Sequence, residues 1–225
     1  MIPKNLHMIW VGNVYTRPDE WINTWRDKNP TWNFRLWNDN DLENGDWLLG
    51  RHIRRLYHKR RFDGVCDLMR YEILARHGGV YADADSICLR PLDIPLRAPS
   101  FWAVFESEKS RPGKIQNAFM GAMAGNRVLL NMIAELSARH NALKRWSWRH
   151  LRQVTLPTFE ATGPDFLTRS IKRSNDAGVT IFPSHYFFPR DVAGNVYKGQ
   201  DEPYADHFYG TAHGAYQKIR WSREG

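Results

Sequence analysis

Short apolar runs alternate along the chain with longer stretches in which apolar residues recur at helical spacing. The short runs predict strands at Leu6–Val11, Trp32–Trp37, Val80–Asp83, Phe101–Phe105, Ala118–Ala124 and Val179–Phe182. The helical spacing predicts helices at Asp19–Asn29, Asp63–His77, Val128–Arg139 and Pro164–Asn175. Strands that alternate with helices are typical of an α/β layer fold with a mostly parallel central sheet.

Glycine, proline and polar residues mark the ends of several predicted elements. Gly78-Gly79 ends the helix that begins at Asp63, and Gly163 stands directly before a helix whose first residue is proline. The polar run Asn38–Asp41 predicts a turn or a helix cap. We find no repeat, low-complexity tract or linker, so we expect one domain over residues 1–225.

The composition narrows the class of protein without identifying it. A chain of 225 residues with 42% hydrophobic and 25% charged residues is neither disordered nor fibrous. Two cysteines, Cys66 and Cys88, exclude a disulfide scaffold and are expected to be free thiols in a reducing compartment. The high aromatic content, with 10 Trp, 9 Tyr and 11 Phe, fits a large core or a site that grips flat ligands.

The net charge of +8 indicates an anionic partner such as nucleotide phosphates, nucleic acid or a membrane surface. Basic residues concentrate in the stretches 51–61 and 144–152, which could follow a membrane or DNA or could simply be solvated helix faces. No run reaches the roughly 20 apolar residues of a membrane span, and the start of the chain lacks a signal-peptide pattern. We expect a cytoplasmic protein, with peripheral membrane association left open.

The chain contains two Asp-x-Asp sequences, so this spacing alone says little. Asp39-Asn40-Asp41 lies in a polar turn, where helix capping is the simpler interpretation. Asp83-Ala84-Asp85 instead ends an apolar strand, where the two-residue period places both carboxylates on one side. Such a pair at the carboxyl end of a sheet strand suits Mg²⁺ or Mn²⁺ bound with a diphosphate. The alternative is two solvated turn aspartates.

Four further residues are candidates for ligand contact. Asp67 and Arg70 lie three residues apart on a mostly apolar helix, so a partly buried, functional charge pair competes with a surface ion pair. Trp10 follows a strand and precedes Gly12, where it could bind a ligand or belong to the core. Asn117 could donate hydrogen bonds to a sugar or serve a turn.

Four motifs follow one another along the chain: Asn5–Gly12, Trp25–Pro30, Asp67–Tyr71 and His77–Asp85. Together they resemble the DXD-sugar glycosyltransferases, which include the Och-type mannosyltransferases, capsular polysaccharide transferases (glycosyltransferase family thirty-two) and, more distantly, the clostridial toxin glucosyltransferases. The resemblance covers roughly the first 95 residues well and is loose beyond them. It implies a GT-A fold, an α/β sandwich that binds a nucleotide-sugar at the carboxyl edge of its sheet.

The resemblance also implies roles for the residues that match the motifs. The tryptophan matching Trp10 stacks on the nucleotide base, and the pair matching Asp67 and Arg70 grips hydroxyls of the transferred sugar. The tyrosine matching Tyr81 lies beside that pair. We therefore expect Trp10, Tyr81 and Asn117 to bind substrate, and Asp67 and Arg70 to bind substrate and take part in catalysis.

The same resemblance implies a metal site in which Asp85 ligates Mn²⁺ (or Mg²⁺) and Asp83 contacts the ribose and the metal region. Both are expected to be catalytic. A residue near the C-terminus completes the site in the relatives, and His213 is the first candidate here. The end of the chain departs from the usual Ser-Trp order, so His207 and Asp206 remain alternatives.

The function that follows from the resemblance is a hexosyltransferase that retains the anomeric configuration. It would move a sugar from a UDP- or GDP-sugar to a hydroxyl of a glycan or glycolipid, as in polysaccharide biosynthesis. Transfer to hydroxymethylated bases of DNA is a second interpretation. A non-catalytic, basic nucleic-acid-binding module is a third, although binding alone needs no Asp83–Asp85 pair at a strand end.

Overall fold

A six-stranded sheet organises the chain, whose computed structural model describes residues 1–145, 158–174 and 176–210. The strand order is β2-β1-β3-β6-β5-β7. The strands are β1 Asn5–Ile9, β2 Asn33–Trp37, β3 Gly79–Ala82, β5 Phe101–Ser107, β6 Arg111–Ala122 and β7 Val179–Phe182. Strand β1 pairs in parallel with β2 and β3, β5 pairs in parallel with β7, and β6 is antiparallel to both neighbours. The predicted mostly parallel α/β sheet is confirmed.

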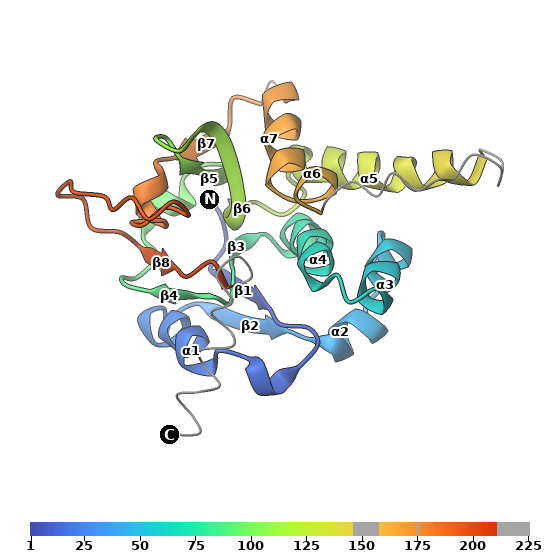
Figure 1. Ribbon diagram of the computed structural model, residues 1–225, viewed down its shortest axis with the longest axis horizontal. Coiled ribbons are helices and arrows are strands. Elements are labelled where there is room, and N and C mark those ends of the chain that lie inside the picture. The colour runs from blue at the N-terminus through green and yellow to red at the C-terminus, as the bar shows by residue number, and fades with distance from the viewer. Residues whose placement is uncertain (146–157, 175, 211–225) are drawn as a thin grey trace.

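Helices cover both faces of this sheet, and a small second sheet lies beside it (Figure 1). The helices are α1 Asp19–Lys28, α2 Asp39–Asn44, α3 Gly50–His58, α4 Phe62–His77, α5 Arg127–Arg145, α6 Thr158–Ala161 and α7 Pro164–Arg173. Single 3-10 turns occur at Val14–Thr16, Ile94–Arg97 and Ser184–Tyr186. The second sheet pairs β4, Ser86–Cys88, with β8, Ala205–His207, in antiparallel register. None of the described helices combines the length and apolar character needed to cross a bilayer.

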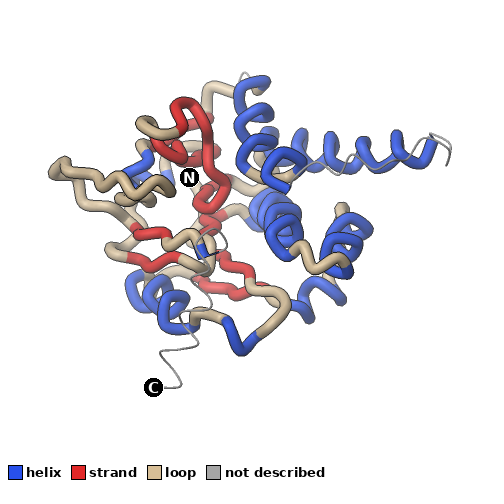
Figure 2. The backbone as a smooth tube through the Cα atoms, in the orientation of Figure 1, coloured by secondary structure: helices blue, strands red, loops and turns tan. Residues whose placement is uncertain are grey.

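Two apolar cores form because the inner strands are buried on both faces. On β1, Leu6 and Met8 point into the core that α1 covers, whereas Ile9 belongs to the core under α4, α5 and α7. Figure 2 shows the same division, with α4, α5 and α7 on one side of the sheet. Strands that are buried on both faces carry continuous apolar runs. Such runs are a clear sequence signal, so the inner strands could be predicted.

The glycine pair after α4 determines how the helix joins the sheet. Gly78 is the C-cap with φ +60°, and Gly79 has φ +112°. A Cβ on Gly79 would lie 2.3 Å from the backbone oxygen of Asn5, so only glycine fits. The chain therefore passes directly from α4 into β3, which brings Asp67 and Arg70 on α4 close to Asp83 after β3.

Several elements differ from the sequence prediction. Strand β6 begins at Arg111 rather than Ala118, because its polar first half, with Pro112 and Gly113, pairs with β5 as a hairpin. Helix α5 extends to Arg145 rather than Arg139. Helices α2, α3 and α6 and strands β4 and β8 were not predicted as elements, since each is too short or too polar for a clear periodic signal.

Candidate active site

The acidic pair lies at the carboxyl end of β3, but in a turn rather than on the strand. The Asp83 backbone N–H donates to the Ala118 carbonyl oxygen at 3.0 Å, and β3 ends one residue earlier. The Ser86 hydroxyl donates to the Asp83 carbonyl oxygen at 2.6 Å and closes the turn that leads into β4. The strand period therefore does not explain why the two carboxylates lie together. The turn brings the two carboxylates together, and Asp85 is buried in it with 6% of its surface exposed.

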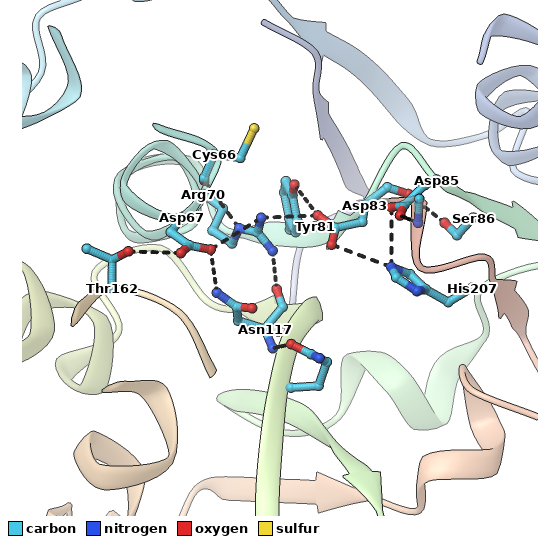
Figure 3. Close-up of polar contacts among 12 residues, drawn as sticks. Cys66, Asp67, Arg70, Tyr81, Asp83, Asp85, Ser86, Asn117, Thr162 and His207 are labelled. Carbon is cyan, nitrogen blue, oxygen red and sulfur yellow. Dashed lines mark hydrogen bonds and ion pairs between the residues drawn. The ribbon is translucent and has the colours of Figure 1, made fainter. Parts of the chain in front are cut away.

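His207 completes a cluster with the two aspartates (Figure 3). Its Nε2 lies 3.3 Å from Asp85 Oδ1 and 3.6 Å from Asp83 Oδ2, and one ligand atom from each residue lies within 4.8 Å of the others. The register of the small sheet pairs Ser86 with His207, which carries the imidazole to the turn. Asp206, the next residue along β8, instead forms an ion pair with Arg190 at 2.6 Å. His213 lies outside the described residues.

The cluster is electrostatically coupled. Burial alone would raise the pKa of Asp85, but the charge and hydrogen bond of His207 and the Gly210 N–H outweigh burial and lower it to about 2. Burial would lower the pKa of His207, and the charge of Asp85 with the contacts to both aspartates raises it instead. In the neutral imidazole, Nδ1 accepts the Tyr209 N–H at 3.1 Å and Nε2 carries the ring proton that faces the carboxylates.

Arg70 links the helix α4 to the acidic turn. It is 4% exposed, and its three nitrogens contact protein atoms on different elements. Nη2 lies 3.1 Å from Asp83 Oδ1 and 3.5 Å from Asp67 Oδ1. Nη1 donates to the Asn117 carbonyl oxygen at 2.6 Å, and Nε donates to the Cys66 carbonyl oxygen at 3.2 Å. The predicted Asp67–Arg70 pair is thus a buried link in a network rather than a surface ion pair.

Asp67 is 6% exposed, and each of its carboxylate oxygens accepts a hydrogen bond. Oδ1 accepts from Asn117 Nδ2 at 2.7 Å, and Oδ2 accepts from the Thr162 hydroxyl at 2.9 Å. Burial raises the pKa of Asp67 to about 6, against the opposing effects of Arg70, Thr162 and Asn117. Thr162 was not among the predicted site residues, because its role depends on a contact across 95 positions of the sequence.

Tyr81 lies on β3 and contacts this network, and Trp10 follows the neighbouring strand β1. The Tyr81 hydroxyl donates to Asp83 Oδ1 at 2.7 Å, and the Arg70 guanidinium lies 4.4 Å from the centre of the Tyr81 ring. Trp10 is half-buried just after β1, packs against the core that α1 covers, and donates from Nε1 to the Asn13 carbonyl oxygen at 3.0 Å. The structure thus brings Asp67, Arg70, Tyr81, Asp83, Asp85 and Asn117 into one contiguous site.

The basic stretch 51–61 forms α3 and the turn after it. Arg51, Arg54, Arg55, Lys59 and Arg60 are all exposed. Exposed basic side chains are expected both for a solvated helix face and for a face that binds an anionic surface. The predicted binding of an anionic surface by this stretch therefore stays a prediction. The side chains of the second stretch, 144–152, lie outside the described residues.

Comparison with known proteins identifies the class to which this fold and site belong. Residues 16–102 match the family described as a glycosyltransferase sugar-binding region containing a DXD motif. The resemblance to DXD glycosyltransferases that the sequence motifs predicted is confirmed over these residues.

Two curated yeast proteins illustrate the relationship. Inositol phosphoceramide mannosyltransferase 3 of Schizosaccharomyces pombe is 30% identical over 176 residues, covering 74% of this chain and 44% of the yeast protein. Mannosyl phosphorylinositol ceramide synthase CSH1 of Saccharomyces cerevisiae is 27% identical over 176 residues, covering 75% and 42%. The chain spans less than half the length of these two relatives.

Solved structures show the same fold at low sequence identity. The PaToxG glycosyltransferase has a TM-score of 0.58 and 16% identity, with 76% of this chain and 69% of that chain covered. The UDP-bound glycosyltransferase domain from the YGT toxin has a TM-score of 0.58 and 11% identity, with 80% and 79% covered. The GT-A type α/β sandwich expected from the sequence is confirmed.

Proposed function

We propose that the chain, as one GT-A domain over residues 1–225, is a metal-dependent, retaining glycosyltransferase. It would transfer a hexose from a UDP- or GDP-sugar to a hydroxyl of a glycan or glycolipid. The observation that supports this most is the meeting of the Asp83, Asp85 and His207 cluster with the buried Asp67–Arg70 pair. A charge network of this kind at a sheet edge, with a shifted Asp67 pKa, is typical of a catalytic site.

The chemistry of the cluster fits a divalent ion. Two carboxylates and one imidazole suit Mn²⁺, and Mg²⁺ would use mainly the carboxylates. Asp85 and His207 are buried, so an ion there would relieve the cost of keeping the carboxylates together. A bound ion would supply electrostatic stabilisation for the departing diphosphate.

The donor would lie between Trp10 and the Asp67–Arg70 pair. Trp10 would stack on the base, while Asp67 accepts hydrogen bonds from sugar hydroxyls with its carboxylate held by Asn117 and Thr162. Arg70 would fix the orientation of Asp67 relative to Asp83. In a front-face substitution, the bond between the anomeric carbon and the diphosphate oxygen breaks as the acceptor oxygen bonds to that carbon. The hydroxyl proton passes to the departing phosphate.

The acceptor assignment draws on the relatives. Their names describe transfer of mannose to inositol phosphoceramide. We propose an acceptor of the same chemical class, a lipid-linked hydroxyl near a phosphate. A non-catalytic nucleic-acid-binding module would have no use for an Asp–Asp–His cluster in which Asp85 and His207 are buried.

A donor screen tests the proposed function directly. UDP- and GDP-sugars are incubated with the protein and Mn²⁺, and release of the nucleoside diphosphate is measured with and without chelator. We expect Mn²⁺-dependent release from at least one donor, and faster release when inositol phosphoceramide is present. No release from any donor, with nucleotide bound normally, would contradict a catalytic role.

We expect Trp10→Ala to weaken binding of UDP or GDP by about 1–3 kcal/mol, because base–aromatic stacking has this strength. Calorimetry with the free nucleotide measures the loss, and a thermal melt accompanies it. Trp32→Ala is the matched control. Trp32 precedes the amino end of β2, whereas Trp10 follows the carboxyl end of β1, so the two tryptophans lie at opposite ends of this parallel strand pair. Normal nucleotide binding by a destabilised Trp10→Ala protein would make Trp10 a core residue only.

The affinity for Mn²⁺ is expected to increase with pH through the neutral range. A metal ion competes with the proton that charges the imidazole of His207, and the adjacent carboxylates raise the pKa of this group, so the competition persists at higher pH than for an ordinary histidine. Titration of free Mn²⁺ at mildly acidic, neutral and mildly alkaline pH measures the trend. His207→Asn should bind more weakly and with a flatter pH dependence. Equal affinity at all three pH values in the parent protein would remove His207 from the metal site.

A further inference from the structure

A single carboxylate holds the turn that follows β1. Asp39, the first residue of α2, accepts the Gly12 N–H with both oxygens, at 3.0 Å to Oδ1 and 3.2 Å to Oδ2. The Tyr57 hydroxyl, from the last turn of α3, donates to the same Oδ1 at 2.6 Å. Asp39 therefore connects α2 and α3 with the turn after β1. Its contact in that turn is Gly12, two residues after Trp10 in the sequence.

Asp39 differs in this from the other acidic residue of its turn. Asp41 and Asn38 form a capping box at the start of α2, and Asp41 also pairs with Arg35 at 2.7 Å. The sequence interpretation of a helix cap is correct for Asp41. The side chain of Asp39 instead reaches across to Gly12 and Tyr57, contacts that capping does not require.

The backbone at Gly12 leaves little freedom for the turn. Gly12 has φ +93°, and a Cβ there would lie 2.9 Å from Cζ of Phe62, the first residue of α4. On the other side, the Trp10 N–H donates to the Trp37 carbonyl oxygen at 2.9 Å. A backbone hydrogen bond thus holds the turn at the Trp10 end, and the Asp39 carboxylate holds it at the Gly12 end.

We propose that Asp39 is a positioning residue for nucleotide binding, which holds the Trp10 turn in the orientation that stacks on the base of a nucleoside diphosphate. Tyr57 orients the carboxylate from α3. This inference rests on the proposed function, because it takes the base-stacking role of Trp10 as its starting point. The hydrogen bond to Asp39 and burial raise the pKa of Tyr57 to about 12, so its hydroxyl remains a donor throughout the physiological range.

Asp39→Ala, Asp39→Asn and Tyr57→Phe test this role, with Asp41→Ala as the matched control on the same turn. UDP and GDP dissociation constants are measured with Mn²⁺ present, together with the melting temperature. We expect Asp39→Ala to weaken nucleotide binding by about fivefold to tenfold, the effect of losing one or two hydrogen bonds that order a ligand-binding group. Asp39→Asn keeps one acceptor oxygen and should recover much of the affinity. Asp41→Ala should lower the melting temperature without changing the dissociation constant.

A double-mutant cycle with Trp10→Ala separates this inference from the proposed function. If Asp39 acts through Trp10, Asp39→Ala or Tyr57→Phe should change nucleotide affinity less than twofold once Trp10 is alanine. Fully additive losses would overturn the positioning role while leaving base stacking intact. Unchanged affinity in Trp10→Ala alone would overturn base stacking and the positioning role together. One further combination of results would overturn the positioning role. In it, folded Asp39→Asn and Tyr57→Phe both bind nucleotide with wild-type affinity, while Asp39→Ala either binds normally or fails to fold.

Discussion

Replacing Asp85 with alanine is expected to abolish turnover and to remove the Mn²⁺-dependent part of donor binding. Both oxygens of the Asp85 carboxylate contact residues in or after β8, with Oδ1 3.3 Å from His207 Nε2 and Oδ2 accepting the Gly210 N–H at 2.6 Å. Its low pKa keeps it ionised throughout the neutral range. Without it, Asp83 and His207 alone would offer an ion too few charged ligands. The loss of turnover should be at least about a hundredfold, the usual cost of removing a group that stabilises developing charge.

Calorimetry of donor binding with and without Mn²⁺ measures this effect, together with donor hydrolysis. Asp85→Asn is the more informative variant, because its amide oxygen can still accept the Gly210 N–H while the charge is lost. Asp206→Asn is the matched control, since Asp206 lies on the same small sheet but pairs with Arg190. Donor affinity that responds to Mn²⁺ in Asp85→Asn as in the parent protein would place the metal elsewhere.

The part of the site that was predictable from the sequence is the part that is nearly continuous in the chain. Asp67, Arg70 and Asp83 lie on α4 and directly after β3, and the glycine pair between these elements signals the connection. Local signals of this kind, namely helical spacing, a glycine terminator and a short apolar run, need no tertiary information. The resemblance to known glycosyltransferases rested on the same segment.

The rest of the site depends on contacts between distant segments. His207 reaches the acidic turn only because β8 pairs with β4, and each of these strands has three residues, too few for a periodic pattern. The sequence therefore left His207 as one of three candidates for the third ligand. For Asp39 the sequence offered a local explanation, helix capping. Its contacts with Gly12 and Tyr57, which are distant in the sequence, appear only in the structure.

We expect Arg70→Lys to reduce turnover by about a hundredfold or more while free UDP or GDP binds with unchanged affinity. The three guanidinium nitrogens reach Cys66, Asn117 and the two carboxylates of Asp67 and Asp83 in separate directions. A lysine ammonium keeps the charge but has one nitrogen, so it can replace only part of this fork. The Asp67 carboxylate would then shift relative to the acidic turn, and displacements of about 1 Å in such groups cost about a hundredfold in rate.

The stability of the Lys variant is expected to decrease by about 1–3 kcal/mol, because the Asn117 carbonyl oxygen is left in a buried position without its donor. Steady-state kinetics, nucleotide titration and a thermal melt on the same preparation separate this loss from the catalytic one. Arg76→Lys is the matched control, since Arg76 lies on the same helix, has an exposed side chain, and pairs with Glu72 at 3.7 Å. If Arg70→Lys melts at the lower temperature yet turns over like the parent protein, the network around Arg70 supports the fold only. The orientation of the donor sugar would then have to come from Asp67 with Asn117 and Thr162 alone.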